Sequence, residues 1–202
     1  PRPPSACFDP CPERARRATA CVVIADRHFK GLSRPPCAAI IIRGLERIPG
    51  MNPFLAEMIG CLGVEQFRAT YGHPITAFSD GESVLRLLAR QRARTPARCT
   101  TQKKEYGQLL RAVGQSRGSL QPPIRHVPSH VDRGKPATKT KPARPAVPPD
   151  RRTTAMWLNL IADSMVNSAD DPSTLSRLEA SNLLPPYIMC VEVEDLLDGA
   201  MA

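Results

Sequence analysis

The chain has 202 residues, of which 42% are hydrophobic, and this is enough apolar sequence for one ordinary core of roughly 100 to 150 residues. Its longest uninterrupted apolar run, residues 37–42, is far shorter than the ~20 residues that a membrane-spanning helix needs. No secretory leader is recognisable. The composition therefore excludes a membrane-spanning protein and predicts a single intracellular domain.

Positive charge is unevenly distributed. The net charge is +9, and residues 86–152 hold 17 lysines and arginines against three acids, Glu105, Asp132 and Asp150. A basic segment on a compact domain favours a polyanionic partner such as nucleic acid, because neutralising phosphates releases counter-ions. A solvated basic tail would have the same composition, so charge alone leaves both interpretations open.

Cysteine and proline usage bears on context. The seven cysteines form no pair or Cys/His group with zinc spacing, and their odd number fits a disulfide framework poorly. We therefore expect reduced thiols. Most of the 22 prolines lie in residues 1–11, 122–149 and 185–186, which predicts tails and a linker. A start at Pro1 within a proline-rich run suggests a segment cut from a longer polypeptide.

Three strands are expected first. Residues 21–26 and 37–42 are short apolar runs that predict buried strands, and residues 44–48 are suited to a third. Asn52 is a suitable cap for the helix that follows. That helix has one apolar face, whose residues recur at i, i+3, i+4 and i+7: Leu55, Met58, Ile59 and Leu62.

A second group of elements follows. Residues 74–80 predict a strand that ends in an acid, and a helix begins at residues 83–88 and becomes basic towards its end. Residues 101–113 predict another helix, and residues 123–127 a last short strand. The apolar face of the helix at 101–113 contains Tyr106, Leu109, Leu110 and Val113.

The C-terminal third begins with a basic segment. Residues 131–152 are rich in Pro, Lys and Arg, and predict a flexible loop. Thr153 or Thr154 then caps a helix to about residue 169, whose inward-facing residues are Trp157, Ile161 and Met165. Beyond Pro172 only short helical pieces are expected, which either dock on the core or belong to a further module.

This order of elements predicts an α/β fold in which helices cover a mixed sheet. Strands that end in Asp26 and Asp80 would place both carboxylates at one sheet edge if the two strands are parallel and adjacent. Glu57, on the connecting helix, and Asp163, on the last helix, are candidates to add two more acids. A single acid at a strand end is usually only a turn or cap residue.

Five short motifs, taken together, resemble the ribonuclease H family, in the form found in retroelement reverse transcriptases. The resemblance covers roughly residues 20–170. The first motif is a hairpin made of VVIAD, which ends at Asp26, and CAAIIIRG. The second motif is NPFLAEMI, which contains Glu57. FSDGESVLR, with Asp80, is similar to the family's strand-to-helix turn. HVPSH, ending at His130, and NLIAD, ending at Asp163, complete the set.

The resemblance implies a mixed five-stranded sheet flanked by helices and a metal-dependent cut of the RNA strand of an RNA–DNA hybrid. Asp26, Glu57, Asp80 and Asp163 would hold two Mg²⁺ ions, with Mn²⁺ as a possible substitute, and His130 would assist proton transfer. Oxygen ligands suit Mg²⁺, and two ions about 4 Å apart serve both the attacking water and the leaving oxygen. Asp26 would bridge both ions.

The sequence departs from the family pattern in three places. Arg27 and His28 follow the first acid where Gly-Ser is usual, and Ser129 replaces a glycine before His130. Residues 131–152 lengthen the loop before the last acid, so Asp170 or Asp171 stands as an alternative to Asp163. These departures keep a noncatalytic ribonuclease H-like module, which positions nucleic acid, as the alternative function. A basic nucleic-acid-binding protein without this fold is a third hypothesis.

The expected organisation is a linker or disordered lead at residues 1–19, the ribonuclease H-like domain at 20–170 with a basic loop insertion at 131–152, and an extension at 171–202. Expected partners are an RNA–DNA hybrid and an adjacent reverse transcriptase domain in the same polyprotein, and the isolated domain is expected to be monomeric. Candidate contacts to the DNA-strand phosphates are the basic helix after Arg86, with Lys103 and Lys104.

Overall fold

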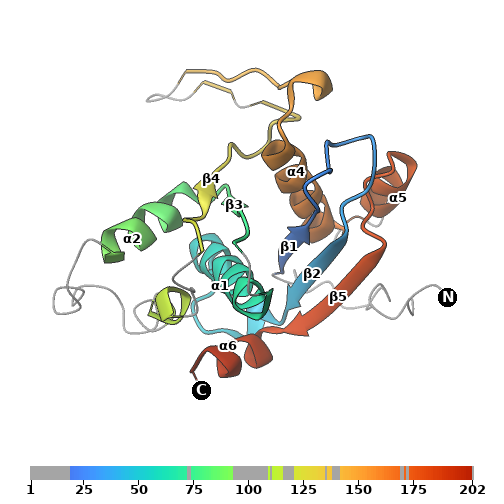
Figure 1. The fold of residues 1–202 in the computed structure, drawn as a ribbon. Helices are drawn as coiled ribbons and strands as arrows, with labels where there is room; N and C mark the ends of the chain where they lie inside the picture. Colours follow the sequence, from blue (N-terminus) through green and yellow to red (C-terminus); the bar gives the residue numbers. More distant parts are fainter. Residues whose placement is uncertain are drawn as a thin grey trace. The chain divides into compact units, whose positions relative to one another are not determined.

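A computed structural model describes residues 19–71, 74–92, 109, 111–115, 121–134, 136–137, 142–168, 171 and 173–201. This part of the chain has a mixed α/β fold with a small mixed sheet, as expected from the sequence (Figure 1). Across the described ranges, no helix combines the length and the apolar character needed to cross a membrane. The chain divides into two compact units. One contains Val23–Ile40 and Val127–Met189. The other contains Ile41–His126 and Cys190–Ala202, together with the start of the first strand.

The three-stranded sheet begins with the hairpin that the sequence predicts. β1 (Ala20–Ile24) and β2 (Ala38–Arg43) are adjacent strands, and the N–H of Cys37 donates to the Ile24 carbonyl at 2.8 Å where the hairpin opens. Buried positions along β2 include Ala39 and Ile42, both fully buried. β2 therefore places most of its apolar residues in the core, while the residues of β1 are half-buried.

The predicted strand at residues 44–48 is wrong, because this segment forms the 3-10 helix η2 (Leu45–Arg47). Gly44 has a φ of 79°, a left-handed conformation that ends the extended backbone. Leu45 can then enter the core, where it is fully buried. The third strand of the sheet comes instead from the C-terminal segment, where β5 (Tyr187–Glu192) lies next to β2.

That third strand also corrects the prediction of only short helical pieces beyond Pro172. The sequence YIMCVE contains β-branched and aromatic residues suited to a strand, but it lies 144 positions after β2 and carries no local pairing signal. Arg47 of η2 donates hydrogen bonds to Glu192 and, at 2.9 Å, to Glu194. These ion pairs link the end of β5 to the segment that follows β2.

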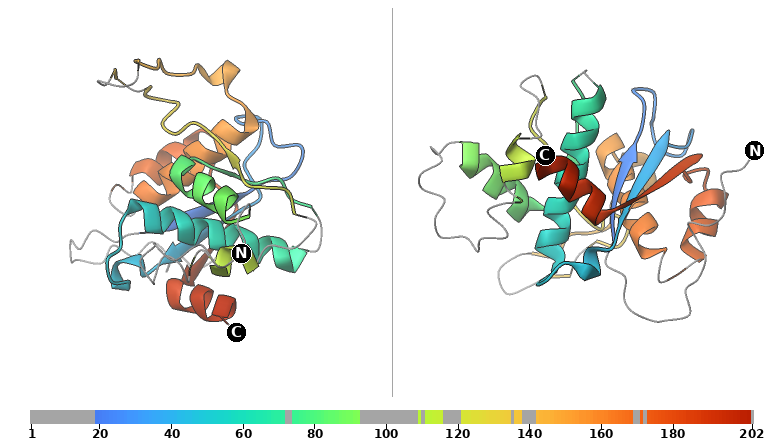
Figure 2. Two further views of the ribbon diagram at one scale, coloured as in Figure 1. Left: turned by 90° about the vertical axis from the view of Figure 1, so that its left-hand side faces the viewer. Right: turned by 90° about the horizontal axis from the view of Figure 1, so that it is seen from below.

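In the unit that contains Ile41–His126, the core is built on α1 (Pro53–Tyr71). The Asn52 side chain caps this helix, as predicted, by accepting the N–H of Leu55 at 3.1 Å. The four residues of the predicted apolar face are all buried, with Val193 and Leu196 of α6 (Val193–Met201) in the same cluster. Figure 2 shows α6 and α2 (Glu82–Arg92) against different sides of α1.

Two short strands in this unit form a separate parallel pair. β3 (Phe78–Ser79) pairs with β4 (Arg125–His126), so that Phe78 is opposite Arg125 and Ser79 opposite His126. The five strands of the described residues are thus divided between a three-stranded and a two-stranded sheet, where one five-stranded sheet was expected. Between these strands, residues 109 and 111–115 are helical and bury Leu109 and Val113 as predicted. The rest of the helix predicted at 101–113, including Lys103 and Lys104, lies outside the described residues.

In the other unit, α4 (Thr154–Asn167) packs with α5 (Ser173–Ala180). Thr153 caps α4, because its hydroxyl accepts the N–H of Met156 at 3.3 Å. The three predicted core residues of this helix, Trp157, Ile161 and Met165, are buried. The Arg152 guanidinium lies 4.8 Å from the centre of the Trp157 ring, a cation–π contact at the start of α4.

The basic loop at 131–152 is more structured than the sequence suggested. Its described part includes η4 (Pro149–Arg151), and the N–H of Val147 donates to the Val131 carbonyl at 2.7 Å. Arg144 donates to the Ser129 carbonyl. These bonds join the two arms of the loop, and Gly134, with a φ of 70°, lets them approach closely, since a Cβ there would lie 2.5 Å from the Arg144 carbonyl oxygen.

Candidate active site residues

Asp26 lies just after β1, where the chain enters the β1–β2 loop. Its Oδ1 accepts the N–H of His28 at 2.8 Å, and the N–H of Phe29 donates to its main-chain carbonyl at 3.2 Å. Its Oδ2 forms an ion pair with the Arg34 guanidinium. The Arg27-His28 turn, a departure from the family pattern, therefore still directs a backbone N–H to the carboxylate.

His130 and Asp163 come together in the same unit as Asp26. Nδ1 of His130 lies 3.9 Å from Oδ2 of Asp163, an ion pair when the imidazole is protonated. Asn159, one turn earlier on α4, donates to the same oxygen at 3.5 Å. His130 has a left-handed φ of 50°, an uncommon conformation for a residue other than glycine.

Asp171, one of the two alternatives to Asp163, has a structural role. Its carboxylate accepts hydrogen bonds from the N–H and hydroxyl of Ser173 and from Thr174, and pairs with Arg177 at 3.0 Å. The Ser173 hydroxyl, followed by the other donors, lowers the pKa of Asp171. Asp171 thus caps α5, while Asp163 is the acid beside His130; Asp170 lies outside the described residues.

Glu57 and Asp80 come together in the other unit. Glu57 lies in the first turns of α1, and Asp80 follows β3 immediately before α2. Burial raises the pKa of Glu57, and the negative charge of Asp80 raises it further. Two carboxylates that repel each other favour a divalent cation between them.

Gly81 explains how the two acids approach so closely. A Cβ at this position would lie 2.4 Å from Oε2 of Glu57, so a larger residue would displace that carboxylate. The N–H of Gly81 donates to the Ser79 hydroxyl at 3.1 Å, and the N–H of Glu82 to the Asp80 carbonyl at 2.8 Å. The strand-to-helix turn is therefore shaped around the Glu57 carboxylate.

Replacing Glu57 with glutamine is expected to stabilise the metal-free protein at neutral pH. Because the folded state raises the pKa of Glu57, it binds the proton more tightly than the unfolded chain, so ionisation of Glu57 costs stability. The cost is absent below the pKa of the unfolded chain and complete above the folded pKa. The gain should stay below about 1 kcal/mol, because solvent screens the half-buried group.

Urea denaturation at pH 7.5 and pH 4 checks this expectation, with Glu82→Gln as the control for loss of one exposed acid from the same unit. The advantage of Glu57→Gln should be seen at pH 7.5 and vanish at pH 4. A Glu57→Gln variant that is less stable than the parent at pH 7.5 without metal would contradict it.

The donor set fits hard divalent cations. Both close groups, Glu57 with Asp80 and Asp163 with His130, present carboxylate oxygens, which Mg²⁺ and Mn²⁺ prefer. No cluster of three or more His, Cys, Asp or Glu side chains suited to an ion occurs within the described ranges. Asp26, Asp163 and His130 belong to one unit and Glu57 and Asp80 to the other.

The four cysteines that the structure describes, Cys21, Cys37, Cys61 and Cys190, are free. Burial raises the pKa of the Cys61 thiol to about 12, so this thiol, on α1 with Glu57, is protonated at neutral pH. A protonated thiol is a poor metal ligand. Oxygen donors are therefore the relevant ligands in this part of the molecule.

Three contributors were missed by sequence reasoning. Arg34 pairs with Asp26, Gly81 makes room for Glu57, and Arg68 anchors the strand that leads to Asp80. Only Gly81 carried a signal, as the glycine directly after an acid at a strand end. Of the expected phosphate contacts on α2, Arg86 pairs with Glu82 at 2.5 Å and Arg90 is exposed.

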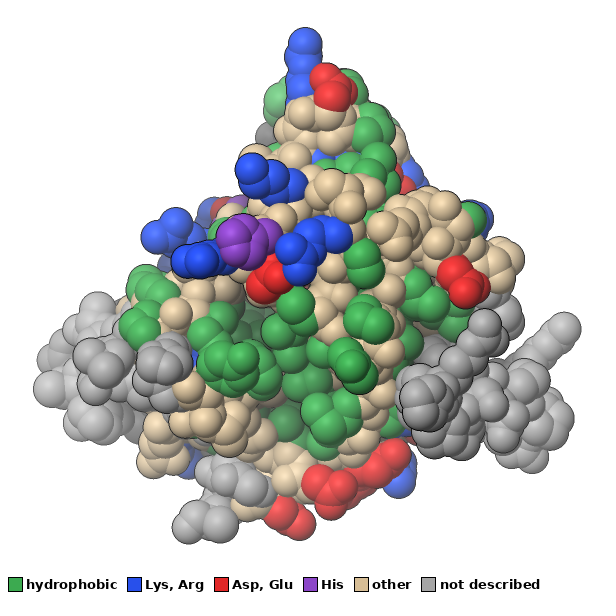
Figure 3. Space-filling view, turned by 45° about the vertical axis from the view of Figure 1, so that its right-hand side comes forward, with side chains coloured by type: hydrophobic (Ala, Val, Ile, Leu, Met, Phe, Trp, Pro, Cys, Tyr) green, Lys and Arg blue, Asp and Glu red, His purple; other side chains and the backbone are tan. Residues whose placement is uncertain are grey.

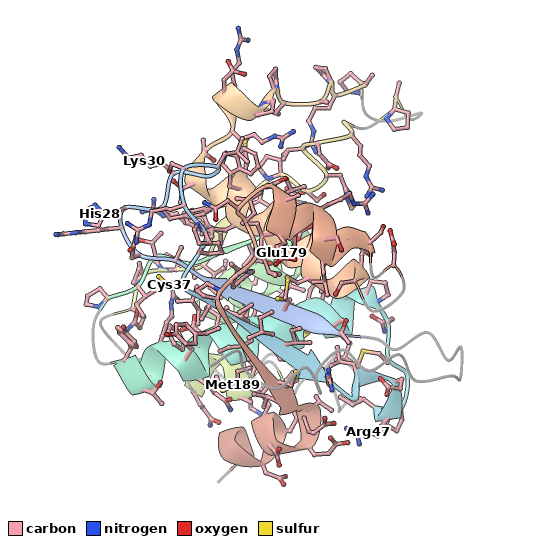
Figure 4. All side chains as sticks on the ribbon, turned by 90° about the vertical axis from the view of Figure 1, so that its right-hand side faces the viewer. His28, Lys30, Cys37, Arg47, Glu179 and Met189 are labelled. Carbon is pink, nitrogen blue, oxygen red and sulfur yellow. The ribbon has the colours of Figure 1, made fainter. Side chains whose placement is uncertain are left out.

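The loop after Asp26 also exposes basic side chains. Arg27, His28 and Lys30 are exposed there, and Figure 4 shows His28 and Lys30 pointing away from the ribbon. Figure 3 shows lysine, arginine and histidine side chains gathering on the face that it draws.

No protein-family model matches the sequence, and neither a curated protein nor a solved structure matches the chain.

Proposed function

We propose that this chain is a metal-dependent ribonuclease H that hydrolyses the RNA strand of RNA–DNA hybrids. The observation that carries the proposal is the Glu57–Asp80 pair, two carboxylates held close enough for one to raise the pKa of the other. Such a pair costs stability in the empty protein, and a bound cation relieves the repulsion; acids with pKa values shifted in this way are typical of functional sites. Asp163 beside His130 adds an acid and a proton carrier.

A ribonuclease H-like fold is part of the proposal. The order β1–β2 hairpin, α1, β3, α2, β4 and α4 supports it, as does the parallel pairing of β3 with β4. β5 next to β2 takes the position that a third hairpin strand would otherwise occupy. In this interpretation the chain completes its sheet with a C-terminal strand.

The proposed chemistry is an in-line displacement at phosphorus. Two Mg²⁺ ions, when bound, supply an activated water and stabilise the leaving 3′ oxygen. The resemblance implies that Asp26, Glu57, Asp80 and Asp163 would hold them through carboxylate oxygens, with Asp26 as the ligand that both would share. His130, whose Nδ1 lies 3.9 Å from Oδ2 of Asp163, would carry a proton.

The proposed substrate and context follow from the same resemblance. Contacts to 2′-hydroxyls in the wide minor groove would distinguish the hybrid from duplex DNA. Exposed Arg90 of α2 is a candidate for contact with the DNA-strand phosphates. We propose an intracellular, monomeric module of a retroelement polyprotein, next to a reverse transcriptase domain.

The test is incubation of the purified chain with a labelled RNA–DNA hybrid in Mg²⁺ or Mn²⁺. Single-stranded RNA and duplex RNA serve as substrate controls, and Asp80→Asn guards against a contaminating nuclease. We expect cleavage of the RNA strand of the hybrid alone, and its loss in the variant. Cleavage that persists in Asp80→Asn would count against the proposal.

A noncatalytic ribonuclease H-like module is the second candidate, and one observation favours it. Arg34 occupies Oδ2 of Asp26, the acid that would be shared by both ions. If this pair is permanent, the positive guanidinium repels a metal ion from that oxygen. Binding of intact hybrid without cleavage in either metal would support this candidate.

A further inference from the structure

The β1–β2 loop is held rigidly against the start of α4. Phe29 is 2% exposed, and its carbonyl accepts the Thr154 hydroxyl at 3.3 Å. Gly31, with a φ of 83°, lies against the Trp157 indole, and a Cβ there would be 2.4 Å from Nε1. Phe29 and Gly31 therefore pack the loop against the start of α4.

This packing sets the direction of the Arg34 side chain. The N–H of Arg34 donates to the Gly31 carbonyl at 3.4 Å, which closes a turn at the anchored glycine. From there the guanidinium reaches back to Oδ2 of Asp26 at 2.5 Å, while Oδ1 accepts the His28 N–H. Both carboxylate oxygens of Asp26 thus have a donor.

The two donors differ in how they would tolerate a cation. A backbone N–H leaves a lone pair of Oδ1 free for a metal, because each carboxylate oxygen accepts more than one interaction. The guanidinium carries a full positive charge, so it and a divalent ion repel each other at Oδ2. The Arg34 side chain is 46% exposed, and an ion pair so exposed is weak enough to exchange.

We propose that Arg34 is the exchangeable counter-ion of Asp26: the guanidinium holds the carboxylate while no metal is bound and gives it up to a divalent cation. This rests on the proposed function, which assigns Asp26 to the metals. Arg34 is a positioning residue in this role. It keeps the Asp26 carboxylate neutralised and oriented before metal binds, and it sets the metal concentration at which Asp26 becomes a ligand.

The test is calorimetric titration of the full chain with Mn²⁺ alone, without nucleic acid. Arg34→Ala should bind Mn²⁺ about three- to tenfold more tightly than the parent, because competition and repulsion at Oδ2 are removed. Arg34→Lys, which keeps the charge but loses the planar fork, should lie between the two. Asp26→Asn should weaken binding.

Arg177→Ala is the matched control, because Arg177 is an exposed arginine that pairs with Asp171 at 3.0 Å in the same unit. It removes the same charge and frees an aspartate, and its Mn²⁺ affinity should stay within about twofold of the parent. Urea denaturation of each variant confirms that it is folded.

Three results would overturn the inference. Unchanged or weaker Mn²⁺ binding in Arg34→Ala, with the expected loss in Asp26→Asn, would reject Arg34 as a competitor and leave the proposed function standing. An equal gain in Mn²⁺ affinity in Arg177→Ala would show that the effect comes from net charge and not from Arg34 at Asp26. Absence of Mn²⁺ binding in the parent and in Arg34→Ala alike would reject the metal site itself, and the inference with it.

Discussion

Replacing Arg68 with alanine is expected to destabilise the protein by about 3 to 5 kcal/mol, the cost of breaking a buried ion pair by removing one partner. The Arg68 side chain has no exposed surface, and that of Glu65, to which it donates at 3.1 Å, is 3% exposed. Arg68 also donates to the carbonyls of Pro122 and Ile75. Truncation therefore leaves a buried carboxylate and two carbonyls without this donor.

The position of these carbonyls extends the effect towards the candidate site. Ile75 precedes β3, and Pro122 precedes β4, so Arg68 ties α1 to the segments that lead into both strands. Gln121 adds to the same network by accepting the N–H of Ile75 at 2.9 Å. Because Asp80 follows β3, loosening this network should also disturb the Glu57–Asp80 pair.

Urea denaturation measures the loss, with Arg90→Ala as the control for removal of an exposed arginine, which should change stability by less than about 0.5 kcal/mol. The double variant Arg68→Met/Glu65→Gln should recover part of the loss, because it removes both charges and fills most of the volume. A loss below about 1 kcal/mol in Arg68→Ala would show that the pair is not buried as described.

Under the proposed function, neutral substitution of each proposed metal-binding acid is expected to lower kcat/KM for hybrid cleavage by about 100-fold or more. The four variants are Asp26→Asn, Glu57→Gln, Asp80→Asn and Asp163→Asn. Metal ions supply several kcal/mol of transition-state stabilisation, and each 1.36 kcal/mol is a factor of ten in rate. His130→Ala should cost less, about 10- to 100-fold, because water can replace a proton carrier in part.

Single-turnover cleavage of a labelled hybrid measures these losses, with Glu179→Gln as the control. Glu179 is an exposed acid of α5, labelled in Figure 4, and its replacement should leave the rate unchanged. Glu57→Gln is the most informative variant, because it should be more stable than the parent without metal and yet inactive. Full activity in Glu57→Gln or Asp80→Asn would remove the pair from the proposed site.

Local sequence patterns predicted the elements that are stabilised by local forces. The apolar face of α1 and its Asn52 cap, the Thr153 cap of α4 and the two strands of the hairpin all follow from residues within a few positions of one another. The positions of Glu57 and Asp80, early in a helix and at a strand-to-helix junction, were predicted for the same reason.

The wrong predictions concern segments whose structure depends on contacts with residues distant in the sequence. Residues 44–48 have the composition of a strand, but Gly44 turns the chain and Leu45 is buried in the core as part of η2. β5 replaces this strand because it can pair with β2, a choice made by hydrogen bonding between segments more than 140 residues apart. Local propensity carries no information on such pairing.

For this protein, the sequence by itself determined the α/β class, the helix caps and the core faces of α1 and α4, because spacing and residue type alone decide these features. The roles of the acids that carry the proposed chemistry rest on the resemblance and stay a prediction. The tertiary structure alone decided which strand completes the sheet, that Arg34 pairs with Asp26, that Gly81 accommodates Glu57 and that the buried Arg68 donates to the segments before β3 and β4. Each of these depends on the distance between groups far apart in the chain, and burial and charge act through that distance.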